Sequence, residues 1–91
     1  MQKYVWETPE EITMVVAEHT KKLRKRLKIS RQKLSEMSGV SYGSIKRFEE
    51  TGNISLLSLT KIAMVLDVSG DIKSIFADVP YKSIQVINEQ K

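Results

Sequence analysis

Helix start signals recur along the chain and constrain its fold more than any other feature of the sequence. In the first signal, Thr8 is placed to cap a helix, Pro9 suits the first helical position, and Glu11 completes a capping box. The later signals are serines of the kind that cap helix N-termini, and they stand at Ser30, Ser41 and Ser55. Because only four glycines and two prolines interrupt 91 residues, and strict alternation of apolar and polar residues is scarce, the sequence favours an all-α fold.

Apolar residues at helical spacing place five helices between these signals. The expected helices cover residues 9–27, 30–38, 42–50 and 56–67, with a short fifth helix that opens at Gly70. The first helix is longer than the others and carries a continuous apolar stripe of Ile12, Val15, Val16, His19, Leu23 and Leu27. The residues expected to face inward from the next three helices are Leu34, Met37, Ile45, Phe48, Leu56, Leu59, Ile62, Ala63 and Leu66.

The chain divides into an N-terminal arm over residues 1–8, a single domain over 9–78 and a C-terminal tail over 79–91. The arm is open to interpretation as disordered, as a strand or as a hydrophobic strap, and the tail as a final helical turn or a short strand. The apolar residues of both flanks are expected to pack on the first helix, on each other or on a partner, since contiguous exposed patches mark interfaces. They are Tyr4, Trp6, Val79, Tyr81, Ile84 and Ile87.

Missing residue types exclude whole classes of site. Without a cysteine, the chain has no disulfide framework, no thiolate zinc site and no cysteine nucleophile. His19 is the only histidine, which excludes multi-histidine metal sites, and we expect this residue to be packed and hydrogen-bonded. No nucleophile is paired with a base, and no glycine-rich loop is present to cradle a phosphate. We therefore expect no enzymatic activity, no cofactor and no metal.

The length of the chain limits the number of cores that it can form, and its hydropathy limits the compartment in which it is expected. Ninety-one residues suffice for one compact core but not for two. No apolar run approaches the ~18 residues of a membrane span, and Met1 begins no signal-peptide pattern. We expect a cytoplasmic protein of bacterial or phage type that makes no membrane contact.

Positive charge is concentrated in one short stretch. Residues 21–33 hold eight of the fifteen lysines and arginines and no acidic residue, whereas the rest of the chain is net acidic. Such a block, at the end of one helix and the start of the next, forms the positive surface that binding to a phosphate backbone requires. The alternative is a solvated helix face without a partner. The formal net charge of +4 and the pI near 9.4 favour a polyanionic partner without establishing one.

Residues 31–48 have the spacing of a DNA-binding helix-turn-helix, with Ser35 where two helix axes meet, Gly39 at the turn, and apolar residues at fixed offsets. With these residues the sequence resembles the XRE/Cro family of repressors, whose domain is the five-helix lambda-repressor-like fold. The resemblance covers about residues 20–77. The matching residues are Leu23, Arg24, Ile29, Ser30, Leu34, Ser35, Gly39, Val40, Ser41, Ile45, Glu49, Glu50, Thr51, Gly52, Ser58, Leu59, Ile62, Ala63, Leu66, Val68 and Ser69.

The resemblance implies that the helix over residues 42–50 lies in the major groove and that its N-terminal half meets base edges. Arg47 is the strongest reader, since a guanidinium pairs bidentately with the O6 and N7 of guanine. Tyr42 offers a hydroxyl and a ring, Gly43 permits close approach, and Ser44 is equally consistent with a capping role. The base-reading positions are Ser41, Tyr42, Gly43, Ser44, Lys46 and Arg47.

The resemblance also implies that the second helix positions the DNA backbone, because its N-terminus points free N–H groups outward. Many relatives have glutamine where Arg31 stands, and the local glutamine, Gln32, follows one place later. A cation at this place is expected to strengthen backbone binding. The phosphate-contacting positions are Ser30, Arg31, Gln32 and Asn53. The nearby Lys21, Lys25 and Lys28 are assigned no more than a long-range field.

In the family, an arginine of the first helix pairs with a glutamate that ends the recognition helix, and Arg24 and Glu49 match these places. The resemblance thus implies a structural, partly buried ion pair that fixes the recognition helix. Two solvated charges are the alternative.

The partners implied by the resemblance are a double-stranded DNA operator and a second copy of the chain, since a homodimer doubles the base contacts on a near-palindrome. The expected dimer surface is the fifth helix, with Ile72, Ile75 and Phe76, together with the flanks. Residues 41–49 and 54–56 look like the HipB-like antitoxin branch, whose members repress their own operon and bind a kinase-like toxin protein. We therefore expect a repressor or an antitoxin-type autorepressor. The alternative is a protein-interaction module that binds a toxin, with DNA binding secondary.

Overall fold

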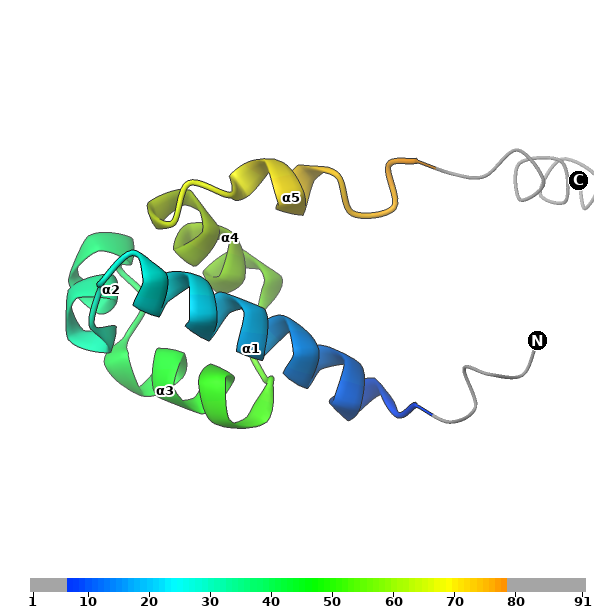
Figure 1. The fold of residues 1–91 in the computed structure, drawn as a ribbon, viewed down its shortest axis with the longest axis horizontal. Coiled ribbons are helices and arrows are strands. Elements are labelled where there is room, and N and C mark those ends of the chain that lie inside the picture. The colour runs from blue at the N-terminus through cyan, green and yellow to red at the C-terminus, as the bar shows by residue number, and fades with distance from the viewer. Residues whose placement is uncertain (1–6, 79–91) are drawn as a thin grey trace, which may run out of the picture.

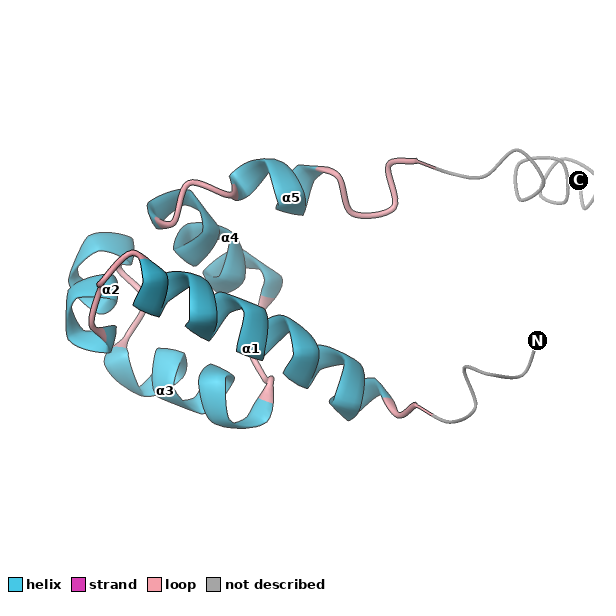
Figure 2. Cartoon of the chain, viewed as in Figure 1, coloured by secondary structure: helices cyan, strands magenta, loops and turns pink. Residues whose placement is uncertain are grey.

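The computed structural model describes residues 7–78, which form five α-helices joined by short loops (Figure 1). Within these residues, Figure 2 shows helices and loops but no strand, so the predicted all-α, five-helix fold is confirmed. The predictions made for the flanks over residues 1–6 and 79–91 lie outside the described residues. The helices are α1 (Pro9–Arg26), α2 (Arg31–Ser38), α3 (Tyr42–Thr51), α4 (Leu56–Val65) and α5 (Ser69–Lys73).

Local capping fixes where the first four helices begin. The Thr8 hydroxyl accepts a hydrogen bond from the Glu11 N–H at 3.1 Å, and the Glu11 carboxylate accepts one from the Thr8 N–H at 3.0 Å, which completes the predicted capping box. At α2, α3 and α4, the hydroxyl of Ser30, Ser41 or Ser55 accepts a hydrogen bond from the backbone N–H three residues later. These four starts therefore follow from the local sequence.

The helix ends depend on residues that adopt positive φ. α2 and α3 stop at Gly39 and Gly52, whose φ angles are 79° and 83°. α4 ends two residues earlier than predicted because Asp67 takes a φ of 64° and turns the chain. α5 ends at Lys73, so the apolar residues expected at its C-terminal end lie in the turns that follow it.

The core lies where α2, α3 and α4 meet. α2 packs on both α3 and α4, while α1 packs on α3 and α5 packs on α4. Burial of one aliphatic side chain contributes roughly 1.5–3 kcal/mol to the free energy of unfolding. A few such residues therefore suffice to hold α2 and α3 at a fixed angle. The centre of the core is formed by Leu34, Val40, Ile45, Ile62 and Leu66.

The first helix turns a different face to the protein than its apolar stripe predicts. Its buried residues are Ala17 and Arg24, which lie two helical turns apart on the side that packs on α3. A small alanine allows close approach, and the arginine pairs with α3, so this face carries no apolar periodicity. The prediction of a packed His19 is wrong, because its side chain is exposed. The stripe residues that are exposed are Ile12, Val15, Val16, His19 and Leu27.

Two further residues expected to face inward are exposed instead. Leu56 stands six residues before the buried Ile62, which places the two side chains about 120° apart around α4. Met37 follows the buried Leu34 by three residues, on the last turn of α2, and lies at the rim of the core with half of its surface exposed. Both residues belong to apolar patterns wider than the face that each helix buries.

Gly52→Ala should destabilise the protein more than Gly39→Ala. Both changes force alanine into a positive φ, which costs about 1–2 kcal/mol of stability. At Gly52, the added Cβ also meets the Thr13 hydroxyl at 2.8 Å and the Met14 N at 3.1 Å. Overpacking adds roughly 1–3 kcal/mol at Gly52, whereas the space around Gly39 is open. Chemical denaturation of both variants measures the difference, and equal losses would show that α3 does not approach α1 this closely.

Candidate nucleic-acid interface

One face of α3 is open to solvent along the helix. The buried residues of α3 are Ile45, Phe48 and Glu49, which face α1 and α2. Figure 1 shows α3 along one edge of the molecule. The fold therefore presents every position that the sequence predicts to read bases, since all six are exposed: Ser41, Tyr42, Gly43, Ser44, Lys46 and Arg47.

Two of these six side chains already have a structural role. The Ser41 Oγ accepts a hydrogen bond from the Ser44 N–H at 3.1 Å and lies 2.8 Å from the Ser44 Oγ. Both hydroxyls complete the N-cap of α3, which lowers their capacity for base contacts. The side chains of α3 that remain free to act on a partner are therefore the longer ones.

Arg47 is the best placed of these longer side chains. No salt bridge or side-chain hydrogen bond in the described part of the chain engages its guanidinium. It lines an open depression of about 360 Å³ together with Ser44, Asn53 and Ser58. The predicted phosphate position Asn53 thus lies beside the predicted base reader and not beside the phosphate positions of α2.

The phosphate positions of α2 gather with lysines of α1. Together they line an open depression of about 420 Å³, where the end of α1, the N-terminus of α2 and the start of α3 meet. The sequence interpretation assigned Lys21 and Lys25 only a long-range field, although their i, i+4 spacing places both on one side of α1. The residues of this depression, which we call the cationic depression, are Lys21, Arg24, Lys25, Ser30, Arg31, Gln32 and Tyr42.

Arg24 and Glu49 form a buried, bidentate ion pair that joins α1 to α3. Arg24 Nε donates to Glu49 Oε2 at 2.7 Å, and Arg24 Nη2 donates to Glu49 Oε1 at 3.1 Å. Arg24 Nη1 also donates to the Ile29 carbonyl at 2.8 Å, which ties the loop between α1 and α2 to the same group. The two side chains are 8% and 1% exposed, so water screens the pair little.

A second arginine shares the same carboxylate. Arg31 Nε donates to Glu49 Oε1 at 2.9 Å, so a position expected to contact phosphate is also held by the protein. Hydrogen bonds to Glu49 and to Tyr42 raise the pKa of the Arg31 guanidinium, which stays a cation. The sequence interpretation missed this contact because it took the replacement of the usual glutamine only as added charge for DNA. The pairing of one buried glutamate with two nearby arginines required the three-dimensional arrangement.

Glu49 is ionised in spite of its burial. Desolvation by burial acts to raise the pKa of its carboxyl group, because a low-dielectric environment disfavours the charged form. The hydrogen bonds and charges of Arg24 and Arg31 outweigh that effect and hold the pKa of Glu49 below its ordinary value. One anion between two cations therefore joins α1, α2 and α3.

The sequence of these helices matches a known protein family. Residues 21–73, more than half of the chain, match the family model described as Helix-turn-helix. The chain belongs to the helix-turn-helix family. The match confirms the resemblance to XRE/Cro proteins and spans the end of α1 and all of α2 to α5. The family is one of DNA-binding domains rather than enzymes, so this helix-turn-helix protein is a DNA-binding regulator.

The family match does not cover the whole described structure. Residues 9–20 of α1 and residues 74–78 lie outside it. No curated protein and no solved structure matches this helix-turn-helix protein. None of the helices within residues 7–78 is long and apolar enough to cross a bilayer. Over the same residues, no group of three His, Asp or Glu side chains gathers as a metal site would need.

Glu49→Gln should destabilise the fold by about 3–5 kcal/mol, because it leaves a buried arginine without its counterion. The matched control is Glu50→Gln, an exposed change expected to stay within about 0.5 kcal/mol. Urea denaturation near neutral pH measures both variants.

The same comparison has a pH dependence with a defined sign. Because folding lowers the pKa of Glu49, its stabilisation is complete above the pKa of the unfolded state and is lost as the pH falls through the folded-state value. The difference in the free energy of unfolding between the unchanged protein and Glu49→Gln should therefore become smaller in acid. A difference in the free energy of unfolding that stays constant down to low pH would contradict the assigned ion pair.

Proposed function

We propose that this helix-turn-helix protein is a sequence-specific repressor that binds a near-palindromic DNA operator as a homodimer, with α3 in the major groove. The observation that carries the proposal is the division of α3 into two faces. Its buried face is fixed by Ile45, Phe48 and the Glu49 ion pairs, while its opposite face is exposed and cationic. A helix held in this way meets base edges without further rearrangement.

Base recognition is assigned chiefly to Arg47. Its guanidinium is free of protein partners within the described residues, and a bidentate contact to guanine is the commonest specific contact in the major groove. Lys46 and Tyr42 extend the reading surface on either side. Ser41 and Ser44 contribute mainly by capping, since each hydroxyl already has a partner.

Backbone contacts are assigned to the cationic depression. The N-terminus of α2 supplies N–H groups at Arg31 and Gln32, and Ser30 caps that end of the helix. Arg31 acts from a fixed position, because its Nε donates a hydrogen bond to Glu49 Oε1 at 2.9 Å. A guanidinium oriented in advance loses less side-chain entropy when it binds a phosphate.

The homodimer is supported by the apolar residues that follow α5. Ile75 is half exposed and Phe76 is 90% exposed, which is unusual for an aromatic side chain without a partner. A dimer through this surface would place two copies of α3 about 34–36 Å apart, or a multiple of that distance, on two operator half-sites. We place this activity in the cytoplasm of a bacterium or of a phage-infected cell, where such operators are found.

A second candidate function, that of an antitoxin, is favoured by two exposed methionines. Met37 and Met64 are 52% and 65% exposed and line an open depression between α2 and α4. Methionine-rich surfaces adapt well to protein partners, and the HipB-like resemblance supplies a kinase-like toxin as the partner. Co-purification with the product of the neighbouring open reading frame, with and without nuclease, tests this function. A complex that disappears with the DNA would count against it.

Arg47→Ala should lower operator affinity by about 1–3 kcal/mol and relax the preference at one base pair. Arg31→Ala is the comparison variant, expected to weaken all duplexes alike and to reduce the salt slope by about one. Mobility-shift titrations against a selected operator and a scrambled duplex, at two salt concentrations, measure both effects. Melting curves are recorded in parallel because Arg31 also bonds Glu49. Unchanged affinity in both variants would refute the DNA-contact assignments.

Gly43→Ala should separate stability from DNA binding. A Cβ at this position would meet no protein atom within 4 Å, so the fold does not require glycine there. Alanine should stabilise α3 by about 0.5–1 kcal/mol, and it should weaken operator binding because the added methyl group occupies the face that approaches the base edges. Thermal melting and operator titration measure the two effects. An affinity equal to that of the unchanged protein would show that close approach at Gly43 is not used.

A further inference from the structure

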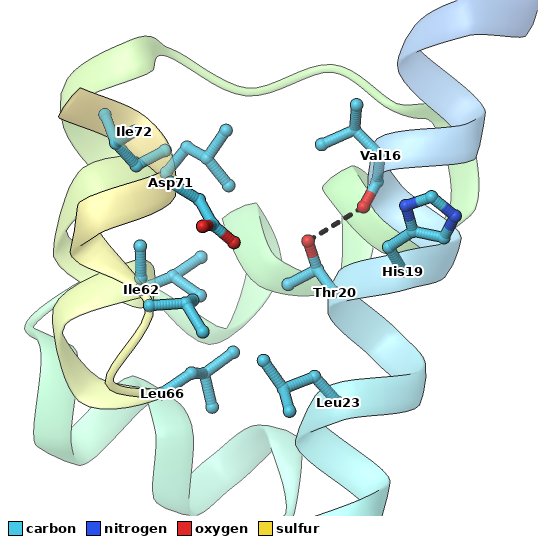
Figure 3. Close-up of a pocket in the computed structure, with 11 residues that line it drawn as sticks. Val16, His19, Thr20, Leu23, Ile62, Leu66, Asp71 and Ile72 are labelled. Atoms are coloured by element: carbon cyan, nitrogen blue, oxygen red, sulfur yellow. Dashed lines mark hydrogen bonds between the residues drawn. The ribbon is translucent and has the colours of Figure 1, made fainter. Parts of the chain in front are cut away.

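An apolar groove lies between α1 on one side and α4 and α5 on the other. In Figure 3, Val16 and Leu23 of α1 face Ile62 of α4 and Ile72 of α5 across open space. The groove has a volume of about 200 Å³. The Thr20 hydroxyl beside it donates to the Val16 carbonyl at 2.8 Å, so this group does not offer its proton to the groove.

The groove is open because α1 lies close to α3, while in the described part of the chain only Leu23 near its C-terminal end packs against the core that α4 shares. Beyond the groove, the apolar stripe continues along α1 toward its N-terminus, where Ile12 is 50% and Val15 is 46% exposed. Exposure of a single apolar residue is ordinary, but a continuous stripe that opens into an apolar groove marks a surface that binds something. The stripe and the groove together form one surface, which we call the α1 surface.

The α1 surface belongs to the parts of the chain that exceed the family domain. Residues 9–20 of α1 and every residue after Lys73 lie outside the family match. Figure 1 shows that the N-terminal half of α1 and residues 74–78 extend toward the same end of the molecule. Both additions to the family domain are rich in apolar residues, and the described parts of both extend toward one end of the molecule.

We infer that the C-terminal segment of the same chain, residues 79–91, covers the α1 surface. This segment has 13 residues and carries Tyr81, Ile84 and Ile87, which lack an assigned partner. The groove residues Val16 and Leu23 lie about 10 Å apart along α1, and 13 residues cover that distance whether extended or helical. The segment starts at the residue after Asp78, and Ile72 of α5 forms one wall of the groove, so it does not have to cross the core to reach it.

Tethering favours this occupant over a second copy of the chain. A segment attached through a short linker meets its site at an effective concentration in the millimolar range, which exceeds the micromolar concentration of a free partner. Asp71 also places a carboxylate at the groove, and Lys82 stands in the tethered segment two residues before Ile84. With its own C-terminal segment on the α1 surface, the chain keeps Phe76 available as a dimer contact.

Disulfide trapping tests the inference directly, because the chain contains no cysteine of its own. The 91-residue chain carries Val16→Cys together with Ile84→Cys or Ile87→Cys. A disulfide forms only where the two Cα atoms come within about 7 Å, so mild oxidation at low micromolar protein should give a cross-link within one chain. The matched control replaces Val16→Cys by Glu18→Cys, an exposed position on the same helix that does not line the groove.

The expected result is a monomeric cross-link that forms about tenfold faster in the Val16 variants than in the Glu18 variants and at a rate independent of protein concentration. Covalent dimers in place of monomers would overturn the inference in favour of a second copy. Equal rates at Val16 and Glu18, or no cross-link, would overturn it as well. None of these readouts involves DNA, so they do not depend on the proposed operator binding.

Thermal melting gives a second measurement on the same protein. Ile84→Asp should lower the melting temperature by about 4–8 °C, because a charge in the segment removes it from the apolar groove. Gln85→Asp, its neighbour, is the control for added charge. If Ile84→Asp and Gln85→Asp melt at the same temperature as the unchanged protein, the segment does not cover the α1 surface.

Discussion

A single buried carboxylate joins the three helices on which the interface depends. Glu49 of α3 accepts hydrogen bonds from Arg24 of α1 and from Arg31 of α2, and Arg24 also binds the carbonyl of Ile29 in the loop between those two helices. Because ion pairs out of water are strong only when their geometry is satisfied, the three helices share one geometric requirement. Loss of this group would remove the hydrogen bonds that tie α3 to both α1 and α2.

The same carboxylate couples the core to the cationic depression. Arg31 extends from the start of α2 into a site that also contains Lys21 and Lys25, while its Nε remains bound to Glu49. The structural role of Arg31 and its proposed contact with the DNA backbone are therefore combined in one side chain, which differs from the glutamine that many relatives carry there. The rest of the chain is net acidic, so positive charge is concentrated near the end of α1 and the start of α2, which fits the proposed orientation of DNA on α2 and α3.

The additions to the family domain lie away from the DNA-facing side. The first half of α1 and the residues after α5 flank the apolar groove, whereas the surface of α3 opposite its buried residues is free. The proposed operator recognition thus uses the matched domain, while the proposed roles of the α1 surface and Phe76 concern packing of the chain on itself or on a second copy. Because the two surfaces are separate, the proposed operator binding and the proposed covering of the α1 surface can be tested with independent variants.

The sequence by itself determined the features that depend on a few neighbouring residues. The four Ser and Thr caps, the left-handed glycine ends at Gly39 and Gly52, and the helix-turn-helix spacing with its exposed α3 face are local, because each rests on hydrogen bonds within one turn or on short offsets. Tertiary structure decided which face of α1 is buried, since Ala17 and Arg24 carry no apolar periodicity and are buried where α1 packs on α3. It also decided that Arg31 shares Glu49, because residues 18 positions apart meet only when two helices cross.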